Sequence, residues 1–72
     1  MIQYRPFEEE RYHADIGPYI SYGIEACDEC GNVVRSISDV STDRTLTASL
    51  CERCTINGLD PIHLRDVVED NI

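Results

Sequence analysis

The sequence predicts a small α+β domain with a bound metal, in which a β-hairpin carrying a Cys-X-X-Cys knuckle is followed by two helices. Three observations lead to this fold class. Apolar side chains alternate along residues 19–26, the four cysteines form two Cys-X-X-Cys pairs, and helix-start residues occur near residue 43 and at Asp60. A chain of 72 residues has room for one domain with a thin core, and small scaffolds usually add a staple such as a metal.

Residues 1–17 are expected to form a loose N-terminal arm outside the folded domain, which is predicted to span residues 18–72. The arm combines the charged stretch Glu8–Arg11 with scattered aromatic side chains. Two alternatives remain open for it. A strand could form around Arg11–Ile16, or the aromatic side chains could dock onto the thin core.

The alternation along residues 19–26 places Ile20, Tyr22 and Ile24 on one face, which is the period-2 pattern of a half-buried strand. A second β-rich run follows at residues 32–38. The connection between the runs reads Cys-Asp-Glu-Cys-Gly, and its glycine lets the backbone turn tightly. The two runs are therefore predicted to form a hairpin whose tip is a metal knuckle.

The central helix has two candidate starts. N-cap residues occupy positions 41–43, and apolar side chains then recur at helical spacing until Asn57 and Gly58, a helix stop. The alternative is a capping box from Ser49 to Glu52, which would begin a shorter helix. Either start places the second cysteine pair three residues apart on one helix face.

A last helix is predicted to begin with Asp60 as its cap and proline at its first position, where the missing N–H costs nothing. It is expected to run to about Asp70 with Leu64, Val67 and Val68 facing inward. Several acidic residues crowd its C-terminal end and oppose the helix dipole. This end is expected to be a solvated, fraying tail, or alternatively a place where a basic partner docks.

The four cysteines predict one structural Zn²⁺ per chain. Twenty residues separate the two pairs, which agrees with zinc sites of this type, and structural zinc prefers four tetrahedral ligands, often all thiolates. The N-terminus has no signal-peptide pattern, so the protein is expected to be cytoplasmic, with reduced thiols. The predicted ligands are Cys27, Cys30, Cys51 and Cys54.

Other uses of the cysteines are an iron centre, disulfide or redox pairs, and unliganded thiols. A rubredoxin-like iron carrier would place both pairs on glycine-containing knuckles, whereas Cys54 is followed by Thr55 on a predicted helix. A thiol sensor that releases zinc on oxidation would require Cys27 and Cys30 to react first. Both remain alternatives to a structural zinc.

Charge and motifs favour a binding protein over an enzyme. The net charge is −8 and the chain has no lysine, which disfavours nucleic-acid binding. It also lacks an apolar run of the roughly 20 residues needed to span a membrane. A zinc closed by four cysteines has no open position for catalysis, and Asp60 beside His63 is explained by capping. The expectation is a non-enzymatic interaction or adaptor module, whose partner is a protein with a basic surface.

A hairpin knuckle that supplies one cysteine pair, followed by a helix that supplies the other, resembles the treble-clef and zinc-ribbon folds over residues 19–57. That resemblance implies fold and metal but no activity. Residues 21–24, 37–43 and 59–70 together resemble an uncharacterised family of short proteins from anaerobic Gram-positive bacteria. This second resemblance covers residues 19–72 and implies bacterial origin and organisation without a mechanism.

Overall fold

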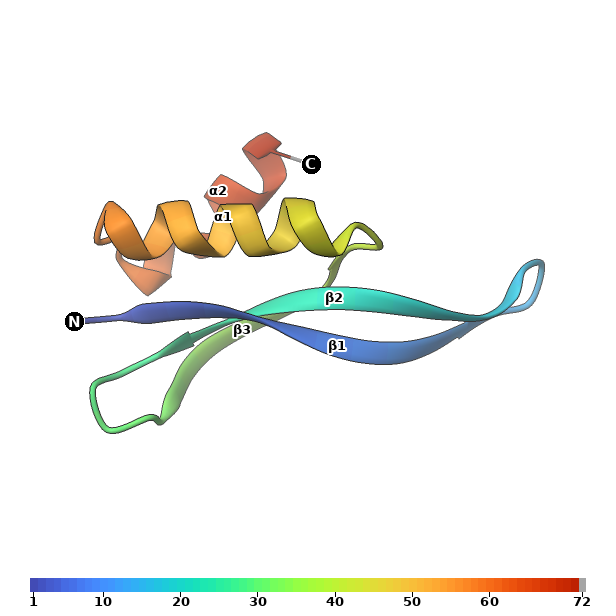
Figure 1. Cartoon of the computed structure of the whole chain (residues 1–72), viewed down its shortest axis with the longest axis horizontal. Helices are drawn as coiled ribbons and strands as arrows, with labels where there is room; N and C mark the ends of the chain where they lie inside the picture. The colour runs from blue at the N-terminus through green and yellow to red at the C-terminus, as the bar shows by residue number, and fades with distance from the viewer. Residues whose placement is uncertain (72) are drawn as a thin grey trace.

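The computed structural model describes residues 1–71. It has the predicted α+β class, with a three-stranded antiparallel sheet in the order β1-β2-β3 followed by helices that lie over one face of the sheet (Figure 1). A short 3₁₀ helix, η1, precedes the last helix. The elements are β1 (Gln3–His13), β2 (Gly17–Cys27), β3 (Val33–Ser41), α1 (Arg44–Ile56), η1 (Pro61–His63) and α2 (Leu64–Asn71).

The expectation of a loose N-terminal arm is wrong, because most of residues 1–17 belong to β1. This strand pairs with β2 along its whole length, from Gln3 opposite Cys27 to His13 opposite Gly17. The alternative strand at residues 11–16 was placed too late, since residues 14–16 form the turn. Docking of an aromatic side chain is confirmed for Tyr4, which is buried in the core.

The predicted hairpin between the second and third runs is confirmed as β2 and β3. Their pairing is regular where Ile24 lies opposite Ile37, but it is interrupted before Tyr22, which lies opposite Ser41. Asp39 sits in this β-bulge with a φ of 55°, a left-handed conformation that is uncommon outside glycine. The Ser21 hydroxyl donates to the Asp39 carboxylate at 2.5 Å, which ties the bulge to the central strand.

Both helix starts that rely on an aspartate cap are confirmed. Asp43 caps α1, with its Oδ1 accepting the Leu46 N–H at 3.0 Å, so the shorter helix from Ser49 is wrong. Asp60 caps the last helical segment, as expected from the proline that follows it. The first turn there is 3₁₀, and the α-helix begins at Leu64.

The core lies between the helices and the face of the sheet that carries the even-numbered residues of β1 and β2. Tyr4 lies opposite Ala26 and Pro6 opposite Ile24 in the register, so these four side chains point to the same face. Leu64 and Val68 are buried from α2 and Val67 is partly buried, as predicted. The remaining buried core residues are Val40, Leu50, Cys51 and Cys54.

The opposite face of the sheet has a close approach at its centre. Phe7 lies opposite Gly23 in the register. A Cβ at position 23 would lie 2.6 Å from the carbonyl oxygen of Ile37 and 2.7 Å from Cε1 of Phe7. Only glycine fits there without displacing the ring and the neighbouring strand.

We expect Gly23→Ala to lower the free energy of unfolding by about 1–3 kcal/mol, the usual cost of overpacking. Urea unfolding followed by circular dichroism measures it. The Ser36→Ala control changes an exposed side chain on β3 and should leave the midpoint almost unchanged. Equal stability of Gly23→Ala and the parent chain would contradict the close packing of Phe7 on β2.

Candidate functional site

The structure separates the four cysteines into three environments. Cys27 ends β2 and is buried, Cys30 is exposed in the turn between β2 and β3, and Cys51 and Cys54 are buried on the inner face of α1. All four are free thiols. Only the pair on α1 is brought together in the way the sequence predicted.

Cys27 is held by a cation on the face of the sheet away from the helices. The Arg5 guanidinium donates to the Cys27 Sγ at 3.0 Å and to the Glu25 carboxylate at 3.0 Å. The hydrogen bond to Cys27 and its charge, followed by the charge of Glu25, raise the pKa of Arg5 above its ordinary value. These three residues share a face because they have the same parity in paired strands.

The turn that was predicted to be a metal knuckle is closed by a carboxylate. Asp28 Oδ1 accepts the backbone N–H groups of Cys30 and Asn32, each at 2.9 Å. These hydrogen bonds, the one from Asn32 being the largest effect, hold the pKa of Asp28 below its usual range. Gly31 completes the turn with a φ of 86°. Aspartate in such a position commonly bonds its own backbone two residues on.

The thiols on α1 are held in their neutral form. Burial raises the pKa of Cys51 from the ordinary 9.0 to about 12, and the charge of Cys54 adds to the effect. Burial also raises the pKa of Cys54, while the neighbouring Arg53 acts against it. Because the thiolate is the nucleophile and metal ligand, this pair behaves at neutral pH as two small apolar core side chains.

The structure does not bring the four cysteines together in one cluster. The helix that carries Cys51 and Cys54 packs on the face of Tyr4 and Ala26, whereas Cys27 shares the other face with Arg5. Within residues 1–71, no group of three or more His, Cys, Asp or Glu side chains is placed to hold a metal ion. The zinc centre therefore stays a prediction from cysteine spacing.

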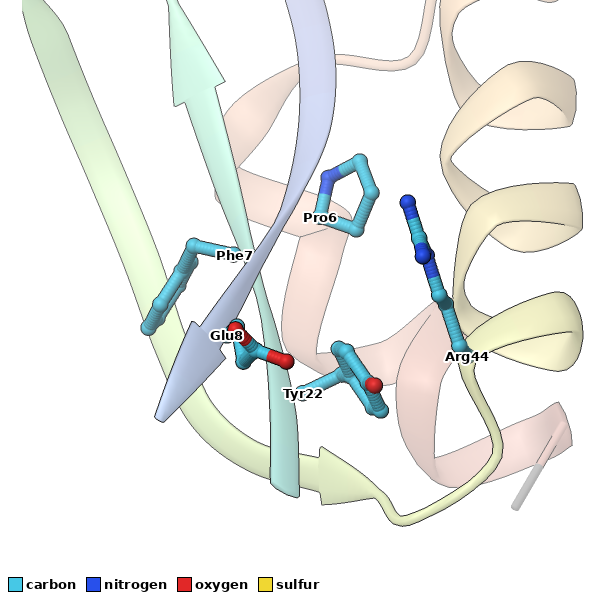
Figure 2. Close-up of a pocket in the computed structure, with 5 residues that line it drawn as sticks. All are labelled: Pro6, Phe7, Glu8, Tyr22 and Arg44. Carbon is cyan, nitrogen blue, oxygen red and sulfur yellow. The ribbon is translucent and has the colours of Figure 1, made fainter. Parts of the chain in front are cut away.

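A small cavity of about 170 Å³ lies where β1 and β2 meet the start of α1 (Figure 2). Pro6, Tyr22 and Arg44 point into the same space, and Phe7 extends to the other side of the strand. Ligand sites for drug-sized molecules usually occupy about 300–1,000 Å³. This cavity is of a size to receive one side chain. A wider hollow of about 460 Å³ at the N-terminus is lined by highly exposed residues such as Met1 and Glu29.

The feature that sequence analysis missed is a distal hairpin, which we define as residues 8–22. It consists of the far halves of β1 and β2 and extends past the start of α1 (Figure 1). Its large apolar side chains are uncovered, with Tyr12 76%, Ile16 70% and Ile20 40% exposed. One signal in the sequence could have indicated this hairpin. The apolar alternation in β2 begins several residues before the part of the sheet that a short helix can cover.

Together these features define a small α+β domain that has one helix-covered sheet face, a closed pair of neutral thiols and an uncovered hairpin. The chain belongs to a family of unknown function (DUF6514), whose family model matches residues 1–72. The resemblance to an uncharacterised family is thereby confirmed and extends over the whole chain. No curated protein and no solved structure gives a significant match. Among residues 1–71, no helix combines the length and the apolar character needed to cross a membrane.

The raised pKa values predict that the fold loses stability in alkali. Above pH 9 the unfolded Cys51 loses its proton, while the folded thiol keeps it until about pH 12. Unfolding then releases protons, so the free energy of unfolding falls as pH rises through this window. Tyr4, whose pKa is raised from 10.0 to about 12 mainly by burial, adds to the fall. Below pH 9 neither group contributes a slope.

Urea unfolding between pH 8 and pH 11 measures this slope. Cys51→Ala should reduce the slope, whatever its effect on stability at pH 8, because it removes one of the groups that titrate. Ser49→Ala, an exposed change on the same helix, should keep the slope of the parent chain. An unchanged slope in Cys51→Ala would show that the thiol is not desolvated.

Proposed function

We propose that this chain is a non-enzymatic protein-interaction module that presents its distal hairpin to a partner. The observation that carries the proposal is the uncovered extension of β1 and β2 beyond α1. A two-stranded hairpin is only marginally stable in water by itself. Exposed apolar side chains gathered on one element mark interaction surfaces more often than isolated ones do. The hairpin is therefore a segment that gains order and burial when a partner covers it.

Charge supports a partner with a basic surface. Residues 8–10 of the distal hairpin are three consecutive glutamates, and the chain as a whole has a net charge of −8. Opposite charge on a partner would speed association and select against acidic proteins. Arg11 is the one arginine in the hairpin, which has no lysine, and it lies close to Glu9, with N and O atoms 3.4 Å apart.

The redox alternatives have less support. A thiol sensor would need Cys27 to react early, but its side chain is only 3% exposed, which limits the access of an oxidant to the sulfur. The pair on α1 has raised pKa values, which lower the thiolate fraction that reacts with oxidants. An iron carrier would need the same four cysteines to converge.

The proposal predicts site-specific photo-crosslinking in the organism that makes the protein. A benzoyl-phenylalanine at position 12 should give one discrete adduct with another protein, because Tyr12 is the most exposed aromatic side chain of the hairpin. The same probe at position 52, an exposed site on α1, is the matched control and should give none. Adding Ile20→Glu should abolish the adduct from position 12. Equal adducts from both positions, or none from either, would overturn the proposal.

Zinc is a second, separate proposal, and it rests on the spacing of the two Cys-X-X-Cys pairs. If zinc binds all four thiolates, Cys27 must leave Arg5 and reach the side of the sheet that carries α1. A site of this kind would couple roughly 10–16 kcal/mol of binding to folding.

Elemental analysis of untagged, anaerobically purified protein, with a chelator titration followed by circular dichroism, decides between the two arrangements. If no zinc is bound, the spectrum should persist after chelation. One zinc per chain with cooperative unfolding on chelation would instead establish the four-cysteine centre and require Cys27 to rearrange. Cys30→Ser provides a check, since it changes only the exposed cysteine and should leave the fold intact if no metal is bound.

A further inference from the structure

The face of the distal hairpin that continues the covered face of the sheet has a simple composition. In the register, Glu8 lies opposite Tyr22, Glu10 opposite Ile20, and Tyr12 opposite Pro18. These even-numbered residues point to the same side of the sheet as Tyr4 and Ile24. In the half of the sheet that holds Tyr4 and Ile24, α1 covers this side. The partner-facing surface is therefore a direct extension of a surface that already packs against a helix. We call this surface, made of Glu8, Glu10, Tyr12, Pro18, Ile20 and Tyr22, the distal face.

The dimensions of the distal face suit a single helix. Two paired strands lie about 4.8 Å apart, so with their side chains they are about as wide as one helix, roughly 10–12 Å. From Glu8 to Tyr12 the strand advances about 14 Å at roughly 3.4 Å per residue, which equals about nine helical residues. A helix of three turns laid along the strands, as α1 is (Figure 1), would cover the distal face.

Two cavities along the distal face differ in the kind of partner side chain that they can accept. The cavity of about 260 Å³ is lined by Glu10, Pro18, Tyr19 and Ile20, so it suits a long side chain with an apolar stem and a cationic end. The cavity of about 170 Å³ beside Tyr22 is lined by both Glu8 and Arg44, whose opposite charges offset each other, so that space suits an uncharged, apolar side chain. Glu8 and Glu10 are two residues apart, or about 6.7 Å, which is close to the roughly 6 Å between helix positions i and i+4.

We infer that the partner presents an amphipathic helix of about three turns, with an apolar side chain and an arginine or lysine four positions apart, which lies along the distal face. This inference rests on the proposed interaction function and names the partner's chemistry. A second copy of this chain is a poor occupant, because each copy has a net charge of −8 and would bring its own carboxylates to Glu8 and Glu10.

The probe is a synthetic 15-residue alanine-based peptide that carries two Leu-X-X-X-Arg repeats on one helix face. Amide chemical shifts of the ¹⁵N-labelled full chain report where it binds at millimolar concentration. We expect shifts confined to residues 8–13, 17–22 and 44–46. Two control peptides are used. One has the same composition in scrambled order, the other has glutamate in place of each arginine, and neither should produce this pattern of shifts.

Variants of the chain test separately the apolar contact and the charged contact that the inference assigns to the partner helix. Ile20→Glu and Glu10→Gln should each weaken binding about tenfold, which corresponds to loss of roughly 1.4 kcal/mol. Glu52→Gln on α1 removes one negative charge outside the distal face and should bind as the parent chain does. Because Ile20 is 40% exposed, its substitution should leave the dispersion of the free spectrum unchanged, and Tyr12→Ser serves as a second variant if it does not.

Four outcomes would overturn the inference. Shifts centred on the acidic end of α2, or equal binding of the scrambled peptide, would mean general charge attraction. Absence of binding, while the crosslink from position 12 persists, would reject a helix and leave the interaction function standing. A concentration-dependent dimer of the free chain through residues 8–22 would identify a second copy as the occupant.

Discussion

The position of α1 on the sheet depends on one residue near the start of the chain, through both its backbone and its side chain. The Tyr4 N–H donates to Thr55 Oγ1 at 2.9 Å, and the Tyr4 hydroxyl donates to the Leu59 carbonyl at 2.5 Å. Its ring lies in the core beside Cys54 and Leu64. Tyr4 thus ties the edge strand to the end of α1 and to the loop that leads into the last helix. Because α1 is anchored at this end of β1, its 13 residues leave the other end of β1 uncovered.

Local signals in the sequence predicted the parts of the fold whose determinants are close together in the chain. Asp43 and Asp60 cap helices through bonds to N–H groups two or three residues away, and the turn after Cys27 is closed within five residues. The pairing of β1 could not be predicted in this way. The charged residues of β1 lie on a two-stranded ribbon that is largely solvated, so β1 does not need alternating apolar side chains to form. The alternating apolar pattern that marks this pair of strands is carried by β2.

The cysteine arrangement could have been anticipated from parity alone. Ile24 and Ala26 are even-numbered and face the core, so Cys27, one residue further along β2, faces the other side. Cys51 and Cys54 flank Leu50 on the buried stripe of α1. Motif spacing measures distance along the chain, whereas strand parity decides which side of the sheet a sulfur occupies.

The bulge at Asp39 affects how readily the edge of β3 can pair with a strand of another chain. The outer edge of β3 carries exposed Val33 and Val34, and an uncovered apolar edge is a template for strand addition by other chains. Regular pairing of this strand covers only residues 35–37, because the Asp39 bulge follows Ile37 and a second register shift lies opposite the step from Ala26 to Cys27. A bulge bends and twists its strand, so that a strand from another chain cannot pair regularly with it. The bulge at Asp39 therefore shortens the regular part of the β3 edge that a strand from another chain could extend.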